Sequence, residues 1–352
     1  MANYVITANN ISELGGAQKI AHTLARGFAQ RGHQVHLIGI TPVNDPHDYH
    51  VGGSYQVHTL MREVWPLKGD VSEGYRSTLR ARAVAELNQL LASLGSANII
   101  ATQLWSLEIL LDALPHARHQ FPVIGQYHGS FAAAASGRDI KRIQKLAPAC
   151  DYFAALSAED CSALLDAGLT NAIAQPNPVS LTAEQFAAVR GIKRGATVDF
   201  VGRLSPEKGP DLLLEAWEHA QLPNPWRLRF TGNGPMRGAS TDRIEYLPPV
   251  SDVLPTIAGA GVVAIPSRTE GAPLVLAEAL ALGTPVVVTD VSSGVREMVA
   301  NNPLAVLVER ENPAALAAGI KRAVTIAPNN PTALPDDTAI FSRWESLFAG
   351  DY

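Results

Sequence analysis

The 352-residue sequence has only two cysteines, Cys150 and Cys161, and no long uninterrupted apolar run. Two cysteines provide neither a disulfide framework nor the ligand spacing of a zinc site, which excludes disulfide-rich secreted domains and zinc modules. The longest apolar stretch, residues 272–288, is interrupted by a glutamate, a glycine and a proline, so it cannot span a membrane. The first residues lack a basic segment followed by an apolar core. We therefore expect no signal peptide and a cytoplasmic location.

Other patterns are missing as well. Charged residues make up 17% of the chain and the formal net charge is -5, which argues against nucleic acid as a partner. No G-x-G-x-x-G follows the first expected strand, so a nicotinamide enzyme is disfavoured. There is no Asp-x-Asp pair, and we expect neither a divalent metal nor a cofactor.

What the sequence does contain is a regular alternation of strands and helices. In the first half a helix over Ala17–Gln30 carries its apolar residues on one stripe. Such alternation predicts an α/β fold with a parallel sheet covered by helices on both faces. Residues 41–74 are rich in Pro, Gly, His and Asp and are expected to be irregular. The expected strands of this half are 4–10, 34–40, 98–102, 123–127 and 152–156.

The alternation breaks at Pro176 and Pro178 and resumes at Val198. At this length two domains are expected. We predict one Rossmann-like domain over residues 1–178 and a second over 179–334. A proline-rich connector then leads to a last helix over residues 338–348.

The most informative segment is "RTEGAPLVLAEALALGTPVVV". It predicts a buried strand, a loop with Glu270, a helix with Glu278, and another buried strand. Pro273 near the start of the helix and Gly283 after its end are typical helix limits. Glu270 then lies at the carboxyl end of a parallel strand, beside the N–H groups of a helix N-terminus. That edge is where open α/β sheets bind ligands carrying hydroxyls and phosphates.

Two further loops follow expected strands of the second half. Arg203 and Lys208 lie in "GRLSPEKG", where a guanidinium and an ammonium would neutralise a diphosphate without a metal. Gly232 and Asn233 belong to "TGNGP", whose glycines let the backbone approach a ligand closely. The segment after it is short, so one helix of this domain is expected to be reduced or missing.

Two loops of the first half also follow strands. Gly15 and Gly16 open the first helix, where free N–H groups would form an anion site. His128 follows the strand near residues 123–127. A lone histidine is more often structural than functional.

Together these motifs resemble the retaining glycosyltransferases of family 4, along essentially the whole chain. The resemblance implies the GT-B architecture, two Rossmann-like domains whose parallel sheets face each other across a cleft, with the last helix crossing back onto the first domain. It implies that Arg203 and Lys208 bind the donor diphosphate and stabilise the departing nucleotide. The resemblance also implies that Glu270 binds the donor sugar hydroxyls and that Glu278 binds the ribose hydroxyls.

The resemblance also places His128 near the reacting carbon of the donor sugar and Gly15 and Gly16 near the donor phosphate and the acceptor. The nucleobase would lie over residues 246–250. Where the family usually has glycine, this chain has Pro273, which lacks an N–H. The remaining donor contacts implied are Gly232, Asn233, Val250, Gly271, Ala272, Leu274 and Val275.

A basic helix face is the last candidate. Four cations fall at i, i+3, i+4 and i+7, opposite apolar residues. A solvated face is one interpretation. The other is a patch for a phosphate-bearing acceptor or for an anionic membrane, which would place the protein peripherally on the inner face of the membrane. The four residues are Arg138, Lys141, Arg142 and Lys145.

We therefore expect a retaining glycosyltransferase that uses a nucleotide diphosphate sugar, a UDP-sugar or GDP-mannose, and a glycan, glycopolymer or lipid-linked acceptor. Two alternatives stay open. One is a nucleotide-sugar epimerase of the same architecture, and the other is a non-catalytic sugar-nucleotide-binding partner of another transferase. The sequence does not name the sugar, the base, the acceptor, the linkage or the oligomeric state.

Overall fold

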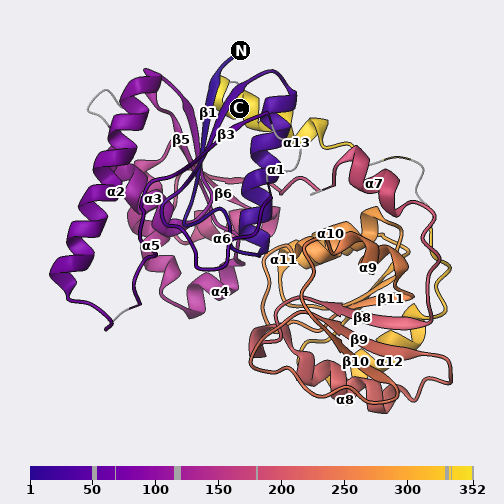
Figure 1. The fold of residues 1–352 in the computed structure, drawn as a ribbon. Coiled ribbons are helices and arrows are strands. Elements are labelled where there is room, and N and C mark those ends of the chain that lie inside the picture. Colours follow the sequence, from indigo (N-terminus) through magenta and orange to yellow (C-terminus); the bar gives the residue numbers. More distant parts are fainter. Residues whose placement is uncertain are drawn as a thin grey trace. The chain divides into compact units, whose positions relative to one another are not determined.

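The computed structural model describes residues 1–49, 54–67, 69–114, 120–179, 181–329, 333 and 335–350. The chain forms two compact units (Figure 1). Residues Met1–Pro178 and Asp337–Tyr352 form the first unit, and Val179–Asp336 form the second. Within the described ranges, no helix combines the length and the apolar character needed to cross a bilayer.

The first unit is built on a parallel sheet. Its described strands follow the order β3-β2-β1-β4-β5-β6-β7, and every pairing is parallel. The strands are β1 (Asn3–Ala8), β2 (Gln34–Gly39), β3 (Gln56–Thr59), β4 (Asn98–Ala101), β5 (Val123–Gln126), β6 (Tyr152–Ala155) and β7 (Ala172–Ala174).

Helices cover both faces of this sheet, as the sequence predicts. On one face Leu79 and Leu87 of α2 and Leu107 of α3 pack against Ile99 and Val123 of the strands. The apolar stripe of α1 is buried. The helices are α1 (Gly16–Gln30), α2 (Glu73–Leu94), α3 (Leu104–Ala113), α4 (Phe131–Ser136), α5 (Asp139–Leu146) and α6 (Ala158–Asp166), with a 3₁₀ turn η2 (Ala147–Ala149).

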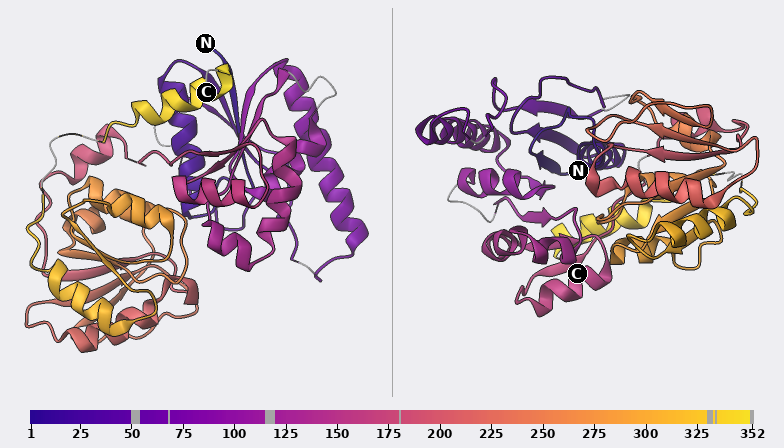
Figure 2. Two further views of the ribbon diagram at one scale, coloured as in Figure 1. Left: turned by 180° about the vertical axis from the view of Figure 1, so that it is seen from behind. Right: turned by 90° about the horizontal axis from the view of Figure 1, so that it is seen from below.

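The last helix, α13 (Thr338–Ala349), packs on α1 and β1 of the first unit (Figures 1 and 2). A Cβ on Gly27 would lie 1.9 Å from the Phe341 ring, so glycine is needed there for the two helices to approach. Arg31 donates to both carboxylate oxygens of Glu345, at 2.8 and 2.6 Å. This bond is the main cause that lowers the pKa of Glu345 to about 2. Trp344 is fully buried.

The second unit also contains a parallel sheet, with the order β10-β9-β8-β11-β12-β13. Pro273 precedes α10 and Gly283 follows it with a left-handed φ of 69°, which confirms the predicted helix limits. The strands are β8 (Thr197–Val201), β9 (Arg227–Thr231), β10 (Ile244–Leu247), β11 (Val262–Ile265), β12 (Val286–Thr289) and β13 (Ala305–Val308).

Helices cover both faces here as well. Leu213 and Trp217 of α8 and Ile320 of α12 pack on one face, and Ile257 of α9 and Leu276 of α10 pack on the other. The helices are α7 (Ala183–Val189), α8 (Pro210–Ala220), α9 (Leu254–Gly259), α10 (Leu274–Ala281), α11 (Ser293–Val299) and α12 (Pro313–Ala323), with a 3₁₀ turn η3 (Pro206–Lys208).

No helix lies between β9 and β10 in the described chain, which confirms the predicted missing helix. Two arginines of the segment between β9 and β10 instead contact neighbouring groups. Arg243 lies over the Trp217 ring, and Arg237 donates to the carbonyls of Gly232, Tyr246 and Leu247. The end of β10 is therefore held by side-chain hydrogen bonds.

The expectation for residues 41–74 is wrong in two places. Gln56–Thr59 form β3, and α2 already begins at Glu73 with Ser72 as its N-cap. β3 is a short edge strand whose side chains are largely exposed, so it lacks the apolar alternation that would reveal a strand.

Candidate functional site

The second sheet reverses its winding direction between β8 and β11. From β8 the chain winds to β9 and β10 on one side, whereas β11 leads to β12 and β13 on the other. Open α/β sheets bind their ligands at the carboxyl ends of the strands at such a point, so we take the loops that leave β8 and β11 as the candidate site and call this edge the β8–β11 crevice. Lys208 lies on the first of these loops and Glu270 on the second.

The structure brings these two predicted residues into contact. Lys208 Nζ lies 2.7 Å from Glu270 Oε1, and the Ser267 hydroxyl donates to the same oxygen at 2.7 Å. The Glu270 side chain is only 11% exposed, whereas that of Lys208 is 32% exposed. A carboxylate and an ammonium thus face the same edge of the crevice.

Arg203 lies on the same loop as Lys208, and its side chain is exposed. Its guanidinium has no hydrogen bond or ion pair to any described residue. The backbone around it is held firmly, because Leu204 N–H donates to Asn233 O at 2.8 Å. A Cβ on Gly232 would lie 1.9 Å from Gly202 O, so only glycine fits that approach. A free cation therefore projects from a rigid turn.

The start of α10 supplies hydrogen-bond donors beside Glu270. Within the described ranges, the backbone N–H groups of four residues have no acceptor. They lie at the positive end of the helix dipole. The loop is fixed from behind, since Ser292 Oγ donates to Gly271 O at 2.7 Å. The four residues are Gly271, Ala272, Leu274 and Val275.

Glu278 lies one turn further along α10 and is 1% exposed. Its neighbours Leu276 and Ala279 are fully buried. A carboxylate at such a position is costly unless it has partners. Its position in a helix that starts at the crevice agrees with the predicted helix placement.

The first sheet has its own point of reversal, between β1 and β4. The two loops there are joined, because Gln103 Oε1 accepts from Asn9 N–H at 2.8 Å. The prediction of two free N–H groups at the start of α1 is wrong for Gly15, whose N–H donates to the Tyr49 hydroxyl at 2.8 Å. Gly16 N–H has no acceptor in the described part of the chain. Tyr49 comes from the segment after β2, which sequence spacing could not place there.

His128 follows β5, as predicted, and precedes α4. The residue is half-buried, but its Nε2 atom is buried and has no hydrogen-bond partner among the described residues. Burial lowers the pKa of His128 to about 4. The loop is anchored where Phe131 N–H donates to Asp160 Oδ1 at 3.0 Å. The imidazole is therefore neutral at physiological pH.

Comparisons with known proteins agree with this geometry. The family model described as "Glycosyltransferase Family 4" matches residues 14–182, and the one described as "Glycosyl transferases group 1" matches residues 195–325. The chain belongs to glycosyltransferase family 4. An uncharacterized glycosyltransferase from Haemophilus influenzae is 26% identical over 337 residues, which span 92% of this chain and 89% of the relative.

Solved structures show the same fold. Anabaena HepE in complex with UDP and glucose superimposes with a TM-score of 0.71 at 18% identity, over 99% of this chain and 100% of that one. A TarM variant from S. aureus, in complex with fondaparinux, alpha-GlcNAc-glycerol and UDP, gives 0.75 at 11% identity over the same shares. This glycosyltransferase therefore has the GT-B fold of two Rossmann-like domains.

Two charged residues of the glycosyltransferase that the sequence did not single out lie at the same crevice. The Arg268 guanidinium donates to both carboxylate oxygens of Asp211, at 3.0 and 2.6 Å. This pairing lowers the pKa of Asp211 and raises that of Arg268. The two residues are 57 positions apart in the chain, so no local motif could reveal the pair.

A buried carboxylate in the strand before the crevice was also missed. Asp199 of β8 is fully buried and accepts from Arg229 Nε of β9 at 2.8 Å. Burial raises the pKa of Asp199 to about 6 despite the nearby cation. The aspartate within the apolar "TVDFV" was a visible signal. It lies in the sheet rather than in the loops, which favours a structural role.

The nucleobase was predicted to lie over residues 246–250. Arg237 already donates to the carbonyls of Tyr246 and Leu247, and the next two residues are prolines without an N–H. Val250, which is half-buried, supplies the next backbone N–H along the chain. Backbone contacts to a base would therefore depend mainly on Val250 within this segment.

The predicted basic face is only partly available. Arg138 is the N-cap of α5, and Arg142 pairs with Glu108 at 3.1 Å and with Asp139 at 3.2 Å. Two carboxylates therefore neutralise Arg142. Arg138, Lys141 and Lys145 are exposed and have no ion pair among the described residues.

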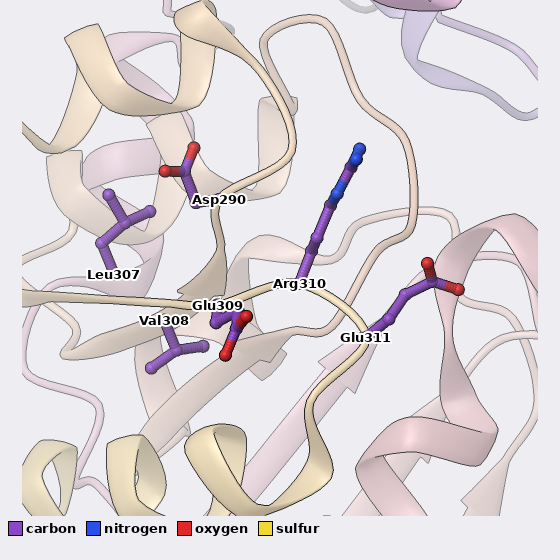
Figure 3. A pocket seen from close by; sticks show the side chains of 6 residues that line it. All are labelled: Asp290, Leu307, Val308, Glu309, Arg310 and Glu311. Atoms are coloured by element: carbon purple, nitrogen blue, oxygen red, sulfur yellow. The ribbon is translucent and has the colours of Figure 1, made fainter.

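An open hollow of about 570 Å³ lies at the carboxyl ends of β12 and β13 (Figure 3). Asp290 stands on one side of it, and Arg310 and Glu311 extend from the segment after β13 (Figure 3). Asp290 is paired with Arg296 at 2.8 Å. The described lining residues include none of the predicted donor-site residues, so we place the candidate site at the β8–β11 crevice and not in this hollow.

Proposed function

We propose that this glycosyltransferase transfers a sugar, with retention of configuration, from a nucleotide diphosphate sugar to a hydroxyl of a glycan, glycopolymer or lipid-linked acceptor. A UDP-sugar or GDP-mannose is the proposed donor. The single observation that carries the proposal is the Lys208–Glu270 contact at the switch point, beside the free Arg203. This arrangement presents cations for a diphosphate and a carboxylate for sugar hydroxyls on adjacent loops.

The proposed chemistry is electrostatic. As the bond between the anomeric carbon and the diphosphate oxygen breaks, the nucleotide leaves with the electron pair of that bond. Arg203 and Lys208 offset the negative charge that builds on the diphosphate, and the N–H groups at the start of α10 add to this stabilisation. Because these groups supply the charge, the proposed reaction requires no divalent metal.

The two glutamates have separate proposed roles. Glu270, on the loop after β11, accepts from the donor sugar hydroxyls, and Glu278 accepts from the ribose hydroxyls. Glu270 is shared at present by Lys208 and Ser267. Binding of the donor must therefore loosen the Lys208–Glu270 contact, so that the ammonium turns to the phosphate and the carboxylate to the sugar.

The first unit is proposed to bind the acceptor. Gly16, with its N–H available, is proposed to lie near the donor phosphate and the acceptor, whereas Gly15 would first have to release Tyr49. The neutral His128 is proposed to lie near the reacting carbon of the donor sugar. Arg138, Lys141 and Lys145 would attract a phosphate-bearing acceptor or an anionic membrane at the cytoplasmic face. The exposure of these three cations supports this part of the proposal.

A screen of nucleotide sugars by thermal shift tests the proposal, because a ligand that binds only the folded state raises the melting temperature. The donor that stabilises the protein is then incubated with candidate acceptors in the presence of EDTA. We expect a glycosylated product whose anomeric configuration, read by proton NMR, equals that of the donor. Turnover of the donor alone to an isomeric nucleotide sugar would instead show an epimerase, and complete loss in EDTA that Mn²⁺ restores would show a metal site.

A further inference from the structure

Two ion pairs link the segment that follows β8 to the loop that follows β11. Lys208–Glu270 joins the loop after β8 to the loop after β11, and Asp211–Arg268 joins the start of α8 to that same second loop. The proposed donor must displace the first pair, since its two members bind different parts of the ligand. The second pair involves no residue assigned to the donor, so it can persist in both states.

We propose that Arg268 and Asp211 are positioning residues that hold the two donor-binding loops at a constant spacing while the Lys208–Glu270 contact opens and closes. This inference rests on the proposed function, because Lys208 and Glu270 are taken to bind the donor.

The contacts of Arg268 explain why it suits this task. Its guanidinium donates to Asp211 through two nitrogens and also to Pro206 O at 2.6 Å. Its backbone N–H donates to Glu207 O at 2.8 Å. One residue therefore contacts the residues on both sides of Lys208 in the chain. Lysine in its place could not reproduce the planar, two-pronged contact.

The backbone between these contacts is closely packed. Gly209 follows Lys208 with a left-handed φ of 66°, and a Cβ on it would lie 2.2 Å from Pro266 O. The two loops are thus in direct backbone contact beside the ion pair. Behind the second loop, Thr289 Oγ1 donates to Ser267 O at 2.6 Å. Arg268 holds the first loop against a second loop that is itself fixed.

The separation of Lys208 and Glu270 matters because each must reach its own part of the donor. Displacement of about 1 Å at a substrate-binding group can cost on the order of 10²-fold in rate. Without the Arg268 side chain, Lys208 and Glu270 keep their charges, but only the bond from the Arg268 N–H to Glu207 O and the Gly209–Pro266 contact still join the two loops, so the separation is held less firmly. The loss should therefore appear in kcat/KM for the donor and not in KM for the acceptor.

Steady-state kinetics with Asp211→Asn, Arg268→Lys and Arg268→Ala test the proposal. We expect kcat/KM for the donor to fall about tenfold or more in Arg268→Ala and by less in Arg268→Lys. The KM for the acceptor should stay within about twofold of the wild-type value in both variants. The double variant Arg268→Ala/Asp211→Asn should lose little more than Arg268→Ala alone, because Arg268→Ala already removes the interaction with Asp211 together with the Arg268 contacts to Pro206 and Glu311. The matched control is Arg227→Ala, which removes the exposed Arg227–Glu245 pair on β9 and β10 of the same unit.

Hydrogen exchange decides the positioning role without any activity measurement. Peptides covering residues 203–211 and 266–272 should exchange faster in Arg268→Ala than in wild type or in the control, while the rest of the second unit is unchanged. Unchanged exchange in both peptides, or a donor kcat/KM within twofold of wild type, would overturn the inference. A wild-type protein that binds no nucleotide sugar would overturn the proposed function instead, and the exchange result would still decide whether the pair holds the loops.

Discussion

Lys208 Nζ and Glu270 Oε1 lie 2.7 Å apart although 62 residues separate them in the chain. They meet because β8 and β11 are neighbours at the point where the second sheet reverses direction. Each residue neutralises the other in the present structure. A ligand with a diphosphate and a hydroxylated ring offers both of them new partners, which is why we interpret this contact as the resting state of a donor site.

The first prediction concerns the two cations. Arg203→Ala and Lys208→Ala should each lower kcat by about 10²-fold or more, because each removes a charge that stabilises the leaving diphosphate. The Arg203 guanidinium makes no hydrogen bond or ion pair with a described residue, so Arg203→Ala should leave the melting temperature unchanged. Stopped-time assays on purified protein measure kcat. Lys321→Ala, an exposed lysine of α12, is the control; a wild-type kcat in Arg203→Ala or Lys208→Ala would refute the assignment.

The second prediction separates the two glutamates. Glu278→Gln should weaken binding of the free nucleotide diphosphate by about 1.5–3 kcal/mol, because ribose hydroxyls lose a charged acceptor. Glu270→Gln should spare the free nucleotide and weaken only the intact sugar donor. Calorimetric titration of both ligands into both variants measures the difference. Equal losses for both ligands in both variants would show that the division of roles is wrong.

How far the sequence could anticipate these sites depends on how local each signal is. Glu270 and the limits of α10 lie in one continuous segment with typical helix ends, and the structure confirms that local geometry. The Asp211–Arg268 pair joins two segments through tertiary packing, and no spacing within either segment announces it. Tyr49, which takes the Gly15 N–H, likewise comes from a segment without periodicity.

The strand β3 shows a different limit of prediction from the sequence. Gln56–Thr59 has four residues at the edge of the sheet, where few side chains need to be apolar. Its pairing with β2 is set by the neighbouring strand and not by its own composition. The buried strands were therefore enough to predict the fold class, whereas the edge strand β3 could not be predicted from its own sequence.

The third prediction concerns pH. Burial lowers the pKa of His128 to about 4, below the value of about 6.5 in an unfolded chain. Between these values the unfolded state binds more protons, so stability rises with pH through this window and is fully present above about pH 6.5. On acidification from pH 8 to pH 5, the free energy of unfolding of the wild type should fall by more than that of His128→Asn. The difference between the two losses should be at most about 2 kcal/mol. Urea unfolding of both proteins at both pH values measures this, and parallel losses would contradict the buried neutral imidazole.

The fourth prediction concerns α5. Changing Arg138, Lys141 and Lys145 to Glu should leave donor binding intact, raise the acceptor KM and reduce sedimentation with anionic vesicles, more at low salt than at high salt. Arg142 is left unchanged because it pairs with Glu108 and Asp139. Changing Lys321 and Arg322 of α12 to Glu is the control. If kinetics and vesicle binding at low ionic strength are the same in both variants, the α5 face is ordinary solvated surface.

The most direct test of the central claim is hydrogen exchange of the wild-type protein with and without the nucleotide diphosphate that the thermal-shift screen selects. A donor site at the β8–β11 switch point predicts slower exchange in two segments, residues 202–208 and 270–278, which carry Arg203, Lys208 and both glutamates. Arg203→Ala should abolish most of that protection at the same ligand concentration. Protection confined to other segments, such as the hollow at the ends of β12 and β13, would contradict the account.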